Sequence, residues 1–276
     1  MKHVRPLIIA AALLPALVPI AAHAHRTWML PSSTVTGGKE PVVTVDASVS
    51  EELFDLNGNA QKLEAVSVTA PDGSAVAIEG STQGKHRSSF DFRPVQKGTY
   101  RIANVSESLF ASYKQGGETK RWRGTADTFA KEVPAGAEDL QVTRMQSRVE
   151  TFVSHEEAGG QATQKLQGAG LELVAFSAPT DLSVDDVSSF RLMLDGKPAA
   201  NVLVTVLRGG NRYRYKLGEM TIKTDADGRF SVKWPEGGMY WLSATIAPPR
   251  GEVQQSSLAQ PLRRLSYSAT FEVLPR

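Results

Sequence analysis

Apolar and polar residues alternate with a period of two in many short segments of this chain. In the first half, residues 43–47, 66–70 and 90–92 place an apolar side chain at every second position, and the Pro-Asp-Gly sequence at 71–73 ends one of these runs. Alternation of this kind, bounded by turn residues, is typical of strands that are buried on one face only. The first half therefore predicts an antiparallel β-sandwich.

The same alternation returns in the second half, for example over residues 190–194, 202–206 and 230–234. Between the halves, residues 159–169 begin with two glycines and contain little apolar pattern, as expected of a linker. We therefore predict an all-β chain with two antiparallel β-sandwich domains, residues 25–158 and 170–276.

A small signature recurs in both halves at a constant offset. A phenylalanine is followed eight residues later by Gly-x-Tyr, at residues 90–100 and again at residues 230–240. Because Gly-x-Tyr often begins a strand in β-sandwiches, convergence also explains this match. It supports two similar sandwiches without establishing a duplication.

Residues 107–139 interrupt the alternation and predict an irregular insertion in the first sandwich. The segment is polar and basic around Tyr113 and Trp122, and residues 125–131 predict a short helix that stops near Pro134. Long insertions in compact domains often carry function. The two aromatic side chains either stack on a sugar or cover a site, or they simply pack onto the sheet.

The first 24 residues have the pattern of an export signal. A basic start precedes an apolar stretch at 7–22, and Ala22 and Ala24 occupy positions −3 and −1 of a small-x-small cleavage site. We expect a cleaved signal peptide over residues 1–24 and a periplasmic mature chain. No later apolar run is long enough to span a membrane, so we expect the mature chain to be soluble.

The cleavage position decides which group begins the mature chain. A cut after Ala24 makes His25 the first residue, and its α-amine and imidazole can then chelate one metal ion, in competition with protons. A cut after Ala22 places that histidine third, an arrangement suited to square-planar Ni(II) or Cu(II). The alternative is that these histidines lie beside the cleavage site and bind no metal.

Composition narrows the chemistry. Residues 1–24 hold two of the 31 basic residues and no acid, so the remaining 29 basic residues equal the 29 acidic ones. This balance argues against nucleic acid as a partner. The chain has no cysteine, which excludes disulfides and thiolate ligands. A transition-metal site must then use carboxylates, methionine sulfur, the amino terminus or the three mature histidines, His25, His86 and His155.

Two resemblances follow from particular motifs. Residues 171–244, with the Asp-Gly-Lys-Pro turn at 195–198 and the Thr-Asp-x-Asp-Gly-Arg-Phe turn at 224–230, resemble the carboxypeptidase-regulatory-like, transthyretin-type sandwich. That resemblance implies a fold and not a function.

The mature chain as a whole resembles a family of periplasmic components associated with cobalt and nickel uptake, long catalogued as a domain of unknown function and called NikM-like. The motifs that carry this resemblance are the Ala-His start with Trp28 and Pro31, the strands at 90–92 and 98–101, the Pro-Ala-Gly at 134–136 before 149–153, and the two turns above. The resemblance implies an exported metal-binding or metal-delivery protein that acts beside a membrane transporter component.

Three functions are consistent with these observations. The first, which we predict, is a periplasmic accessory that binds nickel or cobalt, with copper as a further candidate, through His25, His86 and His155. The second is a glycan- or protein-binding module that needs no metal. The third is a copper oxidase with a histidine brace. Because no Ser-His-Asp or paired-carboxylate signature stands out, we expect no catalytic residues and no enzyme.

Overall fold

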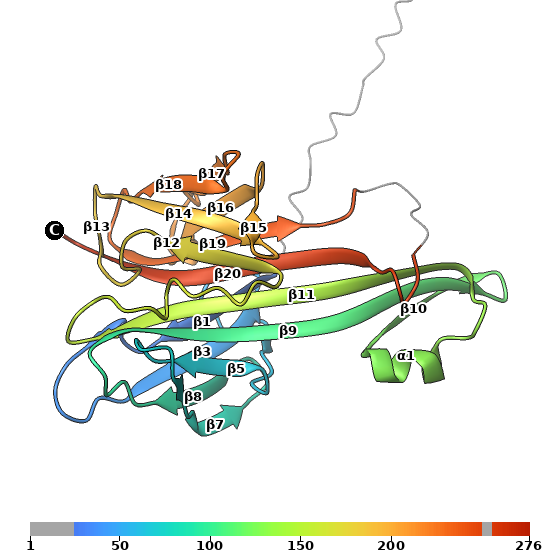
Figure 1. The fold of residues 1–276 in the computed structure, drawn as a ribbon, viewed down its shortest axis with the longest axis horizontal. Coiled ribbons are helices and arrows are strands. Elements are labelled where there is room, and N and C mark those ends of the chain that lie inside the picture. Colours follow the sequence, from blue (N-terminus) through green and yellow to red (C-terminus); the bar gives the residue numbers. More distant parts are fainter. Residues whose placement is uncertain (1–24, 250–255) are drawn as a thin grey trace, which may run out of the picture.

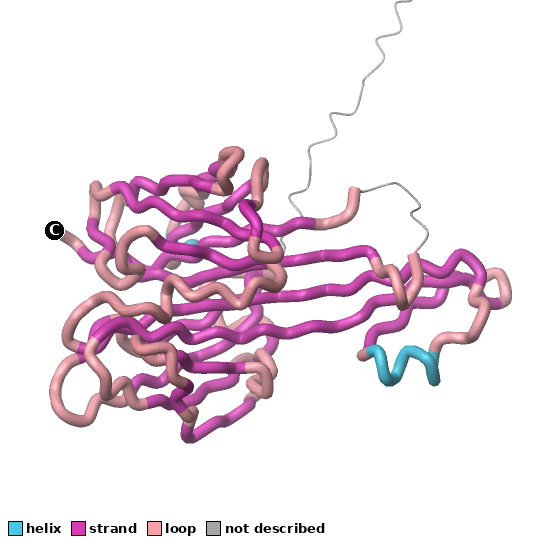
Figure 2. The backbone as a smooth tube through the Cα atoms, in the orientation of Figure 1, coloured by secondary structure: helices cyan, strands magenta, loops and turns pink. Residues whose placement is uncertain are grey.

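The computed structural model describes residues 25–249 and 256–276 of the 276-residue chain. The predicted signal peptide, residues 1–24, lies outside the described residues. The described chain is almost entirely strand and turn, with one short α-helix, α1 (Ala126–Glu132), and one 3-10 turn, η1 (Asn211–Tyr213), among the described residues (Figures 1 and 2). The prediction of an all-β fold is therefore confirmed.

The described strands form three sheets. A five-stranded sheet contains β1 (Arg26–Pro31), β3 (Val43–Ser50), β4 (Asn59–Ala60), β7 (Glu79–Gln83) and β8 (Ser88–Phe92). A four-stranded sheet contains β12 (Leu171–Ala175), β14 (Val187–Leu194), β15 (Lys197–Pro198) and β18 (Arg229–Lys233).

The third sheet has eleven strands and extends through both halves of the chain. From the first half it takes β2 (Val35–Thr36), β5 (Val66–Thr69), β6 (Ala75–Val76), β9 (Gly98–Gln115), β10 (Glu118–Gly124) and β11 (Glu138–His155). From the second half it takes β13 (Leu182–Ser183), β16 (Leu203–Arg208), β17 (Met220–Lys223), β19 (Gly238–Ile246) and β20 (Leu262–Leu274).

The chain buries one apolar core in each half, and Phe152 of β11 packs into the core of the second half. In the first half, the inward positions of β3 and β8 pack against Tyr100, Ile102 and Val153 of the large sheet. In the second half, the core includes Phe190, Phe230, Trp234, Tyr240 and Phe271. Burying each such side chain contributes roughly 1.5–3 kcal/mol.

The recurring Gly-x-Tyr signature occupies the same place in both sandwiches. The Tyr100 hydroxyl donates a hydrogen bond to the carbonyl of Gln96 (3.1 Å), and the Tyr240 hydroxyl donates to the carbonyl of Glu236 (2.8 Å). Both bonds reach back four residues to the turn before the strand, and burial raises the pKa of both phenols. The two strand entries are thus built alike, as the sequence signature suggests.

The two sandwiches lie side by side on the large sheet (Figure 1). Strands β11 and β20 are paired in parallel over nine positions, from Thr143 with Leu262 to Thr151 with Thr270. The segment predicted as a linker, 159–169, contains no strand and connects β11 to β12. The division into two separately folding domains stays a prediction.

Buried charges hold the connecting segment against the shared sheet. The Arg101 guanidinium donates to the carbonyls of Thr163 (2.7 Å) and Lys165 (2.9 Å). Arg148 donates to the Gln167 side chain (2.8 Å) and lies 3.3 Å from Glu150. Because these bonds tie its backbone to the sheet, the segment is a packed part of the fold.

The segment 107–139 differs from the irregular insertion that we predicted. The 18-residue strand β9 runs into the segment as far as Gln115, β10 folds back beside β9 as a hairpin, and the 18-residue strand β11 begins at its end with Glu138. The alternation was missed because the apolar positions change face: Tyr100 and Ile102 are buried early in β9, and Leu109 and Ala111 later. The predicted short helix at 125–131 is confirmed as α1.

The two aromatic side chains of this segment pack onto their neighbours. Trp122 meets Phe129 of α1 edge-on, with ring centroids 5.2 Å apart, and its Nε1 donates to Glu132 (2.6 Å). Tyr113 is buried in the same small cluster. The structure therefore supports the packing interpretation of Tyr113 and Trp122.

Candidate functional site

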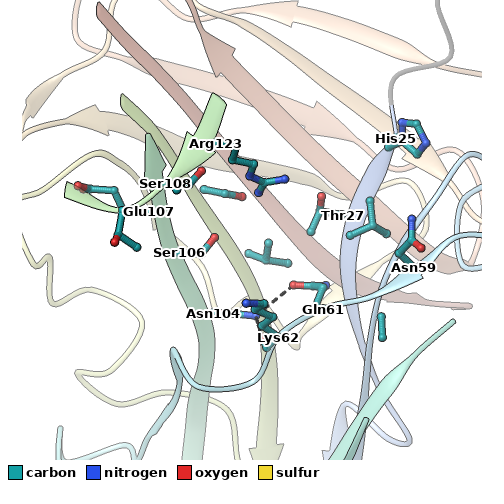
Figure 3. Close-up of a pocket in the computed structure, with 16 residues that line it drawn as sticks. His25, Thr27, Asn59, Gln61, Lys62, Asn104, Ser106, Glu107, Ser108 and Arg123 are labelled. Atoms are coloured by element: carbon teal, nitrogen blue, oxygen red, sulfur yellow. Dashed lines mark hydrogen bonds between the residues drawn. The ribbon is translucent and has the colours of Figure 1, made fainter. Parts of the chain in front are cut away.

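A groove of about 890 Å³ lies where the first sandwich meets the projecting part of β9, β10 and β11 (Figure 3). One wall comes from the start of β1 and from β3 and β4, and the opposite wall comes from the end of β10. Strands β9 and β11 supply the floor between these walls. His25, directly before β1, lines the groove.

Small polar side chains explain why the groove is open. On β9 the inward positions continue from the core residue Ile102 to Asn104, Ser106 and Ser108, and Ser106 faces Ser147 across the β9–β11 ladder. These side chains are shorter than the aromatic and aliphatic residues that fill the same face inside the sandwich. They leave space above the sheet and cover its floor with hydroxyl and amide groups.

Asn104 is the most buried polar group at this floor, with 5% of its surface exposed. Its Nδ2 donates to the Gln61 side chain (3.2 Å) and to the Lys62 carbonyl (2.9 Å). Gln61 is itself fixed, because its Nε2 donates to the carbonyls of Trp28 (2.6 Å) and Ser48 (3.0 Å). The Gln61 oxygen must therefore face Asn104, and this sets the orientation of the Asn104 amide.

The same orientation leaves the Asn104 Oδ1 atom as a buried acceptor with no partner among the described residues. An unsatisfied buried polar atom costs about 1–3 kcal/mol, and native proteins contain few of them. A donor group bound in the groove would remove this cost.

The charged groups of the groove leave an excess of positive charge. Among the described residues, one carboxylate lines the groove, Glu107, and this group is paired with Arg144 (3.4 Å). Arg123 lies over the Phe110 ring, 5.2 Å from its centroid, and neither Arg123 nor Lys62 forms a salt bridge within the described chain. Figure 3 shows Arg123 on the side opposite Gln61 and Asn104, and His25 at one end.

Of the three histidines predicted as metal ligands, the structure places His25 in the lining of the groove. His155 is 4% exposed at the end of β11, with Nδ1 3.2 Å from the Thr36 hydroxyl. Val149, which is the lining residue of β11 nearest to His155, lies six residues earlier on the same strand, roughly 20 Å away at about 3.3 Å per residue. His155 therefore holds β2 against β11 at the far end of the sheet.

His86 is exposed in the loop before β8, and its Nδ1 lies 2.7 Å from the carbonyl oxygen of Gly58. Among the described residues, no group of three or more histidine or carboxylate side chains is placed to hold a metal ion. Only His25 of the three histidines lines the groove. His25 and His86 precede strands β1 and β8, whereas His155 ends the 18-residue strand β11. A position beside a strand therefore does not bring the three side chains to one place.

Sequence reasoning missed Gln61, Lys62, Asn104 and Arg123. Asn104 carried a usable signal: it follows Tyr100 and Ile102 at the inward position of an apolar strand, where a polar residue is unexpected. The others follow from pairing between distant strands, which the sequence pattern alone does not specify.

Within the described residues, no helix has the length and apolar character needed to cross a membrane. The fold and the groove define an all-β protein with two sandwiches on one shared sheet and a polar, cationic groove at one end of the first sandwich. Residues 22–247 match the family described as Domain of unknown function (DUF4198), so the chain belongs to that family. A comparison with curated proteins gave no match.

Several solved structures resemble the chain weakly. The D0–D1 domain of intimin is 15% identical over 88% of this chain and 96% of that chain, with a TM-score of 0.24. Activated Escherichia coli alpha-2-macroglobulin is 13% identical over 92% of this chain and 20% of that chain, also with a TM-score of 0.24. The ICAM-5 D1–D4 fragment is 12% identical over 91% of this chain and 51% of that chain, with a TM-score of 0.22. Likenesses at this level carry no argument about function.

Proposed function

We propose that the protein is an exported metal-binding protein that handles nickel or cobalt, with copper as the competing ion, and that His25 is its anchoring ligand. One observation carries the proposal: the residue that signal cleavage after Ala24 would place first in the mature chain lines the groove. The metal is the cargo, and delivery to a membrane transporter component is the proposed role. No catalytic step is part of this proposal.

The strand that follows His25 is firmly held, which favours tight binding. The Trp28 indole is buried and donates to the Ser50 hydroxyl (2.8 Å). The Thr27 carbonyl accepts hydrogen bonds from Trp241 Nε1 (2.9 Å) and from the Ser268 hydroxyl (2.8 Å). A ligand two residues from these anchors loses little freedom on binding, so less of the binding energy is spent on ordering it.

The donor set suits a late divalent transition metal. Imidazole and a deprotonated amine are nitrogen donors, which bind nickel, cobalt and copper better than magnesium or calcium. His155 is not part of the proposed site, because it lies at the far end of β11.

Native mass spectrometry of the mature protein, titrated separately with nickel, cobalt and copper, tests the proposal. We expect one bound ion at micromolar metal, lost in His25→Ala and in a variant with one extra alanine before His25. His86→Ala is the matched control and should keep the ion, because His86 does not line the groove. A mature protein that takes up no ion, or that keeps it in both His25 variants, contradicts the proposal.

A second function, binding of a polar solute or glycan without metal, is favoured by the unpartnered Asn104 acceptor. In that case, ligand binding would persist in His25→Ala and fail in variants of Asn104. The copper form distinguishes the third function: oxygen consumption with a reductant present would indicate an oxidase.

A further inference from the structure

The proposed metal site is incomplete with protein donors alone. An N-terminal histidine offers an amine and an imidazole nitrogen, whereas square-planar Ni(II) or Cu(II) needs four donors. Among the described residues, the carboxylate that lines the groove besides His25 is Glu107, and it is paired with Arg144. We therefore assign the remaining donors to water or to a molecule bound with the metal.

The size of the groove favours a bound molecule over water. An ion with six waters needs on the order of 180 Å³, since each water occupies about 30 Å³. The groove, at about 890 Å³, falls within the range of sites that hold small organic ligands. It therefore has room for a chelator several times larger than a hydration shell.

The charges of the groove indicate an anionic ligand. Arg123 and Lys62 line it without a carboxylate partner among the described residues, whereas Glu107 is already paired with Arg144. A guanidinium binds a carboxylate through two parallel hydrogen bonds. A neutral sugar would leave both cations without an anion, so the groove fits an organic acid better than a glycan.

The buried Asn104 acceptor adds a second requirement. Its Oδ1 atom needs a donor, and an ionised carboxylate has none. A hydroxyl group donates to Asn104 and also accepts from the serine hydroxyls of the floor. The ligand must then carry carboxylate and hydroxyl groups together.

We propose that the groove binds a small hydroxycarboxylate, and that the metal is carried as the chelate of this ligand. His25 completes the coordination of the metal. Arg123 and Lys62 hold the free carboxylate oxygens, and Asn104 accepts a hydrogen bond from the hydroxyl group. This inference rests on the proposed function, because it names the form in which the metal is held.

Calorimetric titration and native mass spectrometry with nickel, citrate and their preformed chelate test the inference, with citrate as the probe. We expect a protein–nickel–citrate species in one-to-one-to-one ratio. Arg123→Gln should weaken binding of the chelate at least tenfold. Arg121→Gln is the matched control, because Arg121 is exposed on the same strand and does not line the groove. Lys62→Gln, at an exposed position, provides a second variant that leaves folding unaffected.

The outcomes separate the two proposals. If nickel binds but citrate only strips it from the protein, equally in wild type and Arg123→Gln, the inference fails and the proposed function stands. If citrate binds equally well with and without nickel, the inference that the metal is held as a chelate also fails. If neither nickel nor its chelate binds, the proposed function fails, and this inference fails with it.

Discussion

Arg148 lies at the centre of the buried charge network between the sandwiches, and its removal should be strongly destabilising. It is 3% exposed and contacts Glu150 (3.3 Å), Glu172 (3.6 Å) and the Gln167 side chain (2.8 Å). In Arg148→Met, two carboxylates stay buried with one fewer cation. Removing one partner of a buried ion pair costs about 3–5 kcal/mol, a large share of the roughly 5–15 kcal/mol by which proteins are stable.

Urea unfolding and calorimetry of the mature protein measure this cost. At about 2–4 °C per kcal/mol for a chain of this size, Arg148→Met should lower Tm by roughly 6–20 °C. Arg144→Met is the matched control on the same strand. It breaks the exposed pair with Glu107, which should cost less than about 1 kcal/mol.

A double variant tests whether charge balance is the cause. Glu172 accepts backbone hydrogen bonds from Gln167 (2.8 Å) and Gly168 (2.7 Å), and glutamine at this position keeps an acceptor without the charge. Arg148→Met with Glu172→Gln should therefore recover only part of the loss, because the glutamine NH2 group leaves one of these two backbone N–H groups without its acceptor. An Arg148→Met cost below about 1 kcal/mol, equal to the Arg144 control, would refute the reasoning.

Three further predictions follow from other parts of the structure. Gly58→Ala should destabilise the protein markedly in thermal unfolding, because the added Cβ would lie 1.8 Å from a carbonyl oxygen of β3, whereas Gly37→Ala, with open space around it, should be nearly neutral. The Arg263 guanidinium, which binds Asp195 at 2.6 and 2.9 Å, lowers the pKa of that carboxyl. The pair should therefore stabilise the protein at pH values above the ordinary aspartate pKa, near 4, and this stabilisation should be lost as pH falls through the lowered pKa of Asp195. In Asp195→Asn, the free energy of unfolding should therefore depend less on pH in the acid range. Nickel affinity should fall as pH decreases, because protons compete with the metal for the nitrogen donors of the chelate. A pH-independent affinity would exclude this chelate.

The sequence predicted those features that depend on local pattern. Alternation located most strands, and the segment 125–131 contained enough helical pattern to place α1 within a residue. Which strands would pair was not predictable, because alternation specifies a face and not a neighbour. One example is the parallel pairing of β11 with β20, which joins Thr151 to Thr270, a residue 119 positions later in the sequence.

The candidate site was predictable only in part for the same reason. His25 stood out through the cleavage pattern, which is a local signal. The groove around it depends on where β4, β9 and β10 meet, and on the change of buried face between Ile102 and Leu109. The three histidines seemed equivalent in sequence, since each flanks a strand, but the length of β11 places His155 at the opposite end.

The second sandwich contributes to the groove although none of the described residues that line it come from the second half. Both side chains that bind the Thr27 carbonyl, Trp241 and Ser268, come from the second half. Strand β20 also covers the outer edge of β11, pairing Ser266 with Ser147 of the groove floor. Because an edge strand would leave a row of backbone N–H and C=O groups unpaired, this pairing satisfies those groups of β11 and holds the floor in place beneath the His25 strand. The shared sheet therefore gives the second sandwich a positioning role in the site.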